Sequence, residues 1–77
     1  MSAKEFFKSL IGLDIEEARK KLGYWWVCTH SSNNYPIGFN TFERAAGGYL
    51  ELRTQNGKVT MEHHNGLAEI YQKRDIQ

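Results

Sequence analysis

Apolar residues recur at helical spacing near the start of the chain. They fall on one side of a helix that opens with a Ser2–Glu5 pair at capping-box spacing and ends before Gly12. The pattern predicts a short first helix over about 3–11.

The next segment repeats this arrangement. Asp14 and Glu17 have the same capping-box spacing, and an apolar stripe follows at intervals of three and four residues. Three consecutive basic residues then occupy the last turn before Gly23, where they suit the negative end of a helix dipole. These features predict a second helix over 14–22.

The composition changes abruptly after the second helix. Residues 24–30 are aromatic and β-branched and lack a helical polar face, so they predict a strand. Residues 31–48 mix Gly, Pro and Asn with scattered aromatics, which predicts a long loop of the kind that often binds a partner. Further strands are predicted at 49–54, 58–64 and 67–72.

A hairpin is the clearest feature of the second half. Asn56-Gly57 supplies the two residues with positive φ that a tight turn requires. Before the turn, leucines alternate with polar residues, which predicts one buried and one exposed face. After it, Val59 and Met61 are predicted to share one face, and a second Asn-Gly pair precedes the last predicted strand.

Together these elements predict an α+β fold, with two short N-terminal helices packed on one face of a four-stranded antiparallel sheet in the order ααβ-loop-βββ. A chain of 77 residues and 8.9 kDa suits a single domain over 1–77. Its length excludes a TIM barrel, a two-lobed dinucleotide fold or a kinase, and a hydrophobic content of 40% excludes a disordered chain.

Charge and cysteine content limit which classes of partner and which cellular compartment we expect. Ten Lys and Arg against nine Asp and Glu leave a net charge of +1, which provides no broad field to hold nucleic acid or an acidic membrane surface. The single Cys28 cannot close an internal disulfide, which suits a reducing compartment. No stretch approaches the roughly 20 apolar residues of a membrane span, and Lys8 and Ser9 interrupt the first apolar run. We therefore expect a cytoplasmic protein with no membrane partner.

The helical region resembles the helix-turn-helix opening of two related families, the BamE/SmpA-like lipoprotein domains and the repeats of beta-lactamase inhibitor protein. The residues that carry this resemblance are Phe6, Gly12, Leu13, Asp14, Ala18 and Gly23. The stretch YLELRTQNGKVTMEHH is similar to their later hairpin. The resemblance implies a helix-helix-sheet module. The chain shows no lipobox cysteine, signal peptide or disulfide, so an envelope role like that of BamE is not implied.

A shorter resemblance concerns residues 41–44. Thr41-Phe42-Glu43-Arg44 resembles the run around the reactive bond of small serine-protease inhibitors of the potato inhibitor I type. This similarity implies an exposed loop with Phe42 in the specificity position. The arginines that brace such a loop stand at a different spacing here.

Metal binding and catalysis are weakly supported. Cys28 and His30, two apart on a strand, are predicted to share a face, and His63 and His64 add nitrogen ligands, but the two strands need not be neighbours. We expect Cys28 to be a small buried hydrophobe and the histidines to lie at strand ends on the surface. Cys28 or Ser31 near His30 lacks an evident orienting acid. We therefore expect no enzyme activity, no metal and no cofactor.

Exposed aromatic residues are the strongest functional signal. Trp25 and Trp26 would point to opposite faces of one strand, and the long loop carries more aromatics than a small core requires. These features predict a small module that binds another protein, as an inhibitor or a regulatory subunit. The same features leave open a protease inhibitor, a single-stranded nucleic-acid binder that uses strand aromatics, and a homodimer joined at a sheet edge. The predicted anchors are Trp26, Tyr35, Phe39, Phe42 and Arg44.

Overall fold

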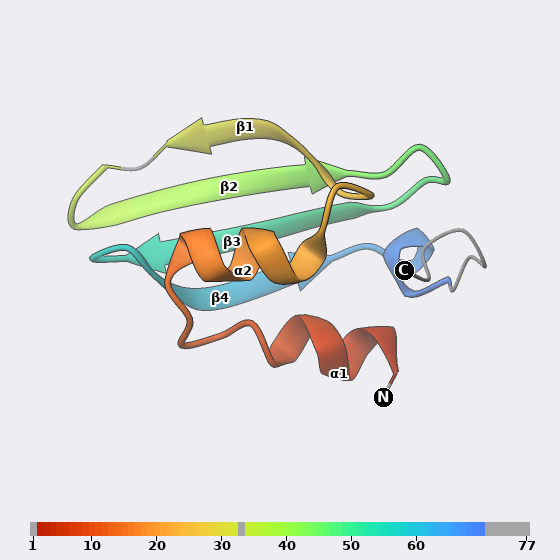
Figure 1. Ribbon diagram of the computed structural model, residues 1–77, viewed down its shortest axis with the longest axis horizontal. Helices are drawn as coiled ribbons and strands as arrows, with labels where there is room; N and C mark the ends of the chain where they lie inside the picture. Colours follow the sequence, from red (N-terminus) through yellow and green to blue (C-terminus); the bar gives the residue numbers. More distant parts are fainter. Residues whose placement is uncertain (1, 33, 71–77) are drawn as a thin grey trace.

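The chain forms a sheet and two helices; the second helix lies across one face of the sheet, and the first lies alongside the last strand (Figure 1). The computed structural model describes residues 2–32 and 34–70. The predicted α+β class is confirmed, with both helices preceding a four-stranded antiparallel sheet. The elements are α1 (Ala3–Lys8), α2 (Ile15–Leu22), β1 (Val27–Ser32), β2 (Ile37–Glu43), β3 (Tyr49–Gln55), β4 (Lys58–His64) and the 3-10 helix η1 (Gly66–Glu69).

The first helix begins at the predicted capping box and ends earlier than predicted. The Ser2 hydroxyl accepts a hydrogen bond from the Glu5 amide at 3.1 Å, and the Glu5 carboxylate accepts one from the Ser2 amide at 3.2 Å. These bonds with Ser2 lower the pKa of Glu5. The helix ends at Lys8 rather than near residue 11, because the chain continues in tight turns whose amides bond to the carbonyl three residues back.

The link between the helices pairs with the edge of β4. The Gly12 amide donates to the Val59 carbonyl at 2.8 Å, and the Val59 amide donates to the Leu13 carbonyl at 2.8 Å. The capping box predicted at Asp14 is wrong, because its side chain makes no capping bond and instead pairs with Lys58 at 3.3 Å. The backbone bonds between this link and Val59 cover part of the β4 edge of the sheet, and β1 forms the other edge.

The sheet is an antiparallel meander in the order β1-β2-β3-β4. The predicted hairpin is confirmed, with Asn56 at φ 53° and Gly57 at φ 83° in the turn between β3 and β4. Leu50 and Leu52 are fully buried, as their alternation with polar residues predicts. The first strand begins at Val27 and not at residue 24, because residues 24–26 form a turn.

The predicted loop over 31–48 is wrong, because it contains β2, one of the two central strands. Gly38 and Asn40, which resemble turn formers, occupy buried positions on the helix side of this strand. A Cβ at Gly38 would collide with the Ser32 carbonyl and lie 2.8 Å from the Thr54 hydroxyl. Position 38 of β2 therefore requires glycine, because the neighbouring strands approach the backbone closely there.

The predicted fourth strand over 67–72 is also wrong for the residues described, since 66–69 form η1; residues 71–72 lie outside the described part. The Asn65 side chain accepts hydrogen bonds from the amides of Ala68 at 3.1 Å and Tyr49 at 3.0 Å. Asn65 is thus an N-cap that starts a helical turn instead of a strand.

Two β-bulges reverse the side-chain alternation in the edge strands. Thr60 is an extra residue in β4, so Val59 is buried while Met61 points to the opposite face. Thr29 is an extra residue in β1, so Cys28 faces the core side and His30 faces away. The predictions that each pair shares a face are wrong for this reason.

The core lies between the helices and the sheet. Each helix and strand except β1 contributes one to three buried apolar side chains. From β1, only the half-buried Cys28 packs against this core. The buried set is Phe7, Leu10, Ile15, Ala18, Leu22, Phe42, Leu50, Leu52, Val59 and Ala68.

Candidate functional site

The five predicted anchors do not form one surface. Trp26 and Arg44 contact each other at one end of the molecule. Phe39 lies on the sheet face opposite the helices, and Tyr35 lies in the exposed turn before β2. Phe42 points into the core.

Phe42 occupies the middle of a paired strand. It is opposite Cys28 on β1 and Leu50 on β3, and only 2% of its surface is exposed. The exposed loop that the potato inhibitor resemblance implies is replaced here by β2. Phe42 is therefore a core residue and not an anchor for a partner.

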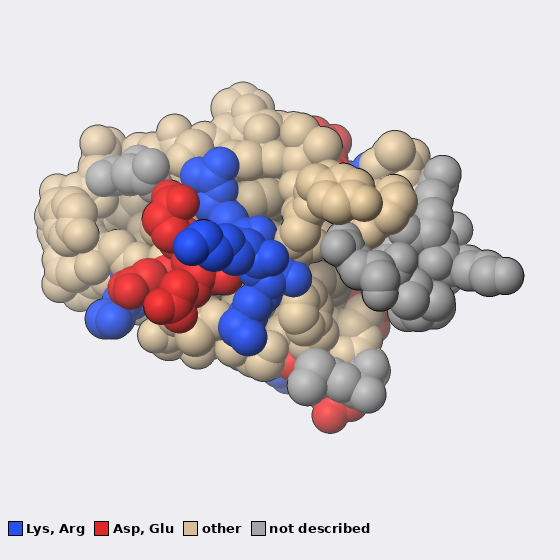
Figure 2. Space-filling view, viewed as in Figure 1, with Lys and Arg blue, Asp and Glu red and all other residues tan. Residues whose placement is uncertain are grey.

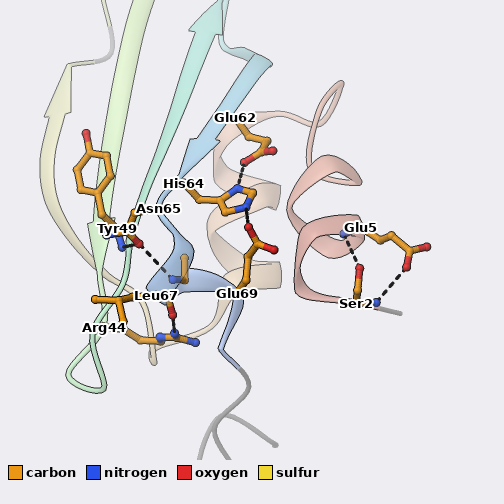
Figure 3. Close-up of polar contacts among 10 residues, drawn as sticks. Ser2, Glu5, Arg44, Tyr49, Glu62, His64, Asn65, Leu67 and Glu69 are labelled. Atoms are coloured by element: carbon orange, nitrogen blue, oxygen red, sulfur yellow. Dashed lines mark hydrogen bonds and ion pairs between the residues drawn. The ribbon is translucent and has the colours of Figure 1, made fainter.

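Arg44 joins the end of β2 to η1, as Figure 3 shows for the bond to Leu67. Its guanidinium donates to the carbonyl of Leu67 at 2.8 Å, of Ile70 at 3.3 Å and of Gly47 at 2.9 Å. It also lies 4.7 Å from the centre of the Trp26 ring. These contacts give Arg44 a structural role, because they hold η1 against the tryptophan.

A hollow of about 430 Å³ lies between α1, the end of α2 and η1. We call it the tryptophan hollow; its walls include Phe6, Lys20, Lys21, Trp25, Trp26 and Ile70. None of the described lining residues is acidic. Figure 2 shows charged side chains of both signs gathered over α2, with the acidic residues in its first turn and the basic ones in its last.

The opposite face of the sheet carries a second group of side chains, which we call the open sheet face. Both helices pack on the other side (Figure 1). Across the strands from β1 to β4, one row is Ser32, Phe39, Arg53 and Met61. The adjacent row is His30, Thr41, Glu51 and His63.

Large apolar side chains on the open sheet face are well exposed. The exposed fraction is 42% for Phe39, 61% for Ile37, 52% for Met61 and 59% for Val27. A shallow hollow of about 410 Å³ lies over β2 and β3, with Phe39 and Arg53 in its walls. The face therefore combines apolar surface with a concave shape.

A polar network occupies the centre of this face. Arg53 Nε donates to Glu51 at 2.7 Å, and the Tyr49 hydroxyl donates to the other Glu51 oxygen at 3.1 Å. The bond from Arg53 lowers the pKa of Glu51, while burial and the bond to Glu51 raise the pKa of Tyr49. The terminal amino groups of Arg53 bond to no residue in the described part of the chain and remain available as donors.

His64 differs from the surface histidine that we expected, because its side chain is only 8% exposed. It lies between Glu62, 2.7 Å from Nδ1, and Glu69, 3.0 Å from Nε2 (Figure 3). Its ring also packs against the ring of Phe7. Burial alone would lower its pKa, but the bonds and charges of the two carboxylates outweigh burial and raise it. A doubly protonated imidazole can donate to both carboxylates, so His64 ties β4 to η1 and α1.

The residues considered for metal binding do not converge. Cys28 is half-buried on the helix side of β1, whereas His30 faces the opposite side. Within residues 2–32 and 34–70, no group of three His, Cys, Asp or Glu side chains could hold a metal ion.

Sequence reasoning does not identify Arg53 or Met61 as site residues. The alternation in β3 places Arg53 on the exposed face, but nothing in the chain order shows that Phe39 lies beside it. Met61 reaches the same row only because of the bulge at Thr60.

Comparisons with known proteins give no relative. No family model matches the chain, and neither the curated proteins nor the solved structures contain a match. Among the described helices, none has the length and apolar character needed to cross a membrane.

Proposed function

We propose that this chain is a protein-binding module that contacts another protein through the open sheet face, as an inhibitory or regulatory subunit. The observation that supports this most directly is the row formed by Phe39, Arg53 and Met61 on three neighbouring strands. Aromatic residues, methionine and arginine are the types enriched in the centres of protein interfaces.

The chemistry of this row defines what a partner must offer. The Arg53 side chain is 60% exposed, and Arg53 stands between Phe39 and Met61 in this row of the sheet. A carboxylate or backbone carbonyl of a partner would accept from Arg53, while apolar partner side chains cover its two neighbours. Such an arginine, desolvated inside an apolar ring, is a typical interface hot spot.

A protein suits this face better than single-stranded nucleic acid. Phe39 and Tyr49 could stack on bases, but the Arg53 charge is offset by Glu51, and Glu43 adds negative charge beside Tyr49. Nucleic-acid binding requires cations that neutralise phosphates along the strand. The charge balance of this face therefore favours a protein.

Protease inhibition and self-association have less support than this contact. A protease-inhibiting loop needs an exposed Phe42, and that residue is buried. A homodimer could form at the β1 edge of the sheet, and sedimentation of the purified chain tests this. A cytoplasmic location belongs to the proposal, because a chain with one cysteine, Cys28, cannot form an internal disulfide.

Cross-linking capture from the source cell, followed by reconstitution with the purified partner, tests the proposal. Arg53→Ala and Phe39→Ala should each weaken the reconstituted complex by about tenfold or more. The matched control is Arg19→Ala, because Arg19 also forms an exposed ion pair with a glutamate but lies on α2. Tyr24→Ala is the aromatic control, since Tyr24 is exposed and lies outside the sheet.

The two sets of variants separate the possible outcomes. Retention of the partner by both controls, with loss in both sheet variants, would support the open sheet face. Equal binding by all four variants, or loss confined to Arg19→Ala and Tyr24→Ala, would contradict it. Circular dichroism on each variant shows whether the fold is retained.

A further inference from the structure

We propose that the tryptophan hollow binds a monocarboxylate with an apolar body, of the kind represented by a medium-chain fatty acid. This site is lined by both helices and shares no described lining residue with the hollow on the open sheet face, so it is independent of the protein contact proposed there. A volume of about 430 Å³ falls within the range of small-ligand pockets, about 300–1,000 Å³.

The charge of the hollow defines the sign of the ligand. Lys20 and Lys21 are wall residues from the last turn of α2, and neither forms an ion pair with any residue the structure describes. No acidic side chain stands among the described wall residues to balance them. Glu16 and Glu17 lie one turn earlier on α2, outside the described walls, so a negatively charged group in the hollow would pair with the two lysines.

The apolar walls define the rest of the ligand. Phe6, Trp25, Trp26 and Ile70 present aromatic and aliphatic surface from three separate parts of the chain. The Trp25 side chain forms part of this wall, and its indole N–H is buried without a hydrogen-bond acceptor among the described residues. A hydrocarbon body with an acceptor at one end matches this combination.

A single carboxylate fits better than a more highly charged group. The carbonyls at the end of α2 carry partial negative charge near Lys20 and Lys21, which disfavours a doubly charged phosphate. The donors of Arg44 are already bonded to the carbonyls of η1 and its neighbours. Two flexible lysines suffice for one carboxylate.

Titration of the full chain with decanoate, followed by tryptophan fluorescence, tests this inference. The chain has two tryptophans and both line the hollow, so the signal reports on the site. We expect a saturable change below the micelle concentration. The charge-reversal variant Lys20→Glu/Lys21→Glu should weaken binding by about tenfold or more, and decanol should bind at least about tenfold more weakly than decanoate.

The matched control is Lys4→Glu/Lys8→Glu. It changes the net charge by the same amount with two exposed lysines of α1 that do not line the hollow, and it should leave decanoate affinity within about twofold. Equal binding of decanol, equal loss in both charge variants, or no saturable signal would overturn the inference. Loss of the circular dichroism spectrum during titration would show detergent-like unfolding and would also overturn it. None of these results bears on the partner contact at the sheet.

Discussion

The two faces of the sheet are built from the same strands, but one is buried and the other is exposed. On the helix side, Phe42, Leu50 and Leu52 are buried almost completely. On the other side, Phe39 and Met61 keep about half of their surface exposed and flank Arg53. The first set forms the core of the fold, whereas the second set remains accessible to another molecule.

The difference in burial between the two faces is largest within β2, where two phenylalanines point to opposite sides of the sheet. Phe42→Ala should lower the free energy of unfolding by about 3–5 kcal/mol, because it opens a cavity in the core. Phe39→Ala should lower it by less than about 1 kcal/mol, because the side chain is largely exposed. Urea unfolding of the two variants measures the difference. Similar losses at both positions would show that the two faces are not distinct.

A second test concerns His64, which holds η1 to the covered side. His64→Ala should cost about 1–3 kcal/mol, because Glu62 and Glu69 lose their buried donor. The pKa of His64 is raised in the folded chain, so its contribution is fully present below the unfolded value of about 6.5 and is lost as pH rises through the folded pKa.

Chemical unfolding from about pH 5 to about pH 9 checks this pH dependence, because that range brackets the titration of histidine. The wild-type chain should lose stability toward the alkaline end, and His64→Ala should remove that part of the slope. A wild-type chain that gains stability over the same range would contradict the assignment.

A smaller loss in the free energy of unfolding is expected for substitutions at the N-terminus of α1. Ser2→Ala removes the hydroxyl that accepts from the Glu5 amide and should cost about 1 kcal/mol. Ser2→Asp retains an acceptor at the same position and should recover most of the loss. Thermal unfolding compares the two variants, and equal destabilisation by both would show that the capping bond is not the cause.

The smallest effect on stability is expected at Arg53. Arg53→Ala breaks an exposed ion pair with Glu51 and should change the free energy of unfolding by less than about 0.5 kcal/mol. The same substitution should weaken partner binding far more, by about tenfold. A loss of stability above about 1 kcal/mol would place Arg53 among the structural residues and weaken the comparison.

Local patterns predict the helices, the Asn56-Gly57 hairpin and the alternation of β3. They fail at β2, because Gly38 and Asn40 resemble turn residues although both face the core. Gly38 lies against Ser32 of β1 and Thr54 of β3, and Asn40 bonds to Ser31 of β1, so their environment depends on strand pairing that local spacing does not reveal.

The candidate sites are less predictable than the fold. The sequence points to Phe39 as an anchor, but its place beside Arg53 depends on strand register, and Met61 joins the same row only because of the bulge at Thr60. The environment of His64 depends on Glu69, which lies in a helical turn where a strand is expected from the sequence. Such groupings arise from tertiary contacts and carry little signal in the order of residues.

Methyl-group nuclear magnetic resonance shows whether a partner binds at the open sheet face. Purified partner is added to the full chain labelled with carbon-13 at its methyl groups. We expect shifts at Val27, Ile37 and Met61, which lie on that face, and unchanged signals from Ile15 in α2 and from Ile11 in the link between the two helices. Shifts confined to Ile11 and Ile15, with Val27, Ile37 and Met61 unchanged, would contradict it.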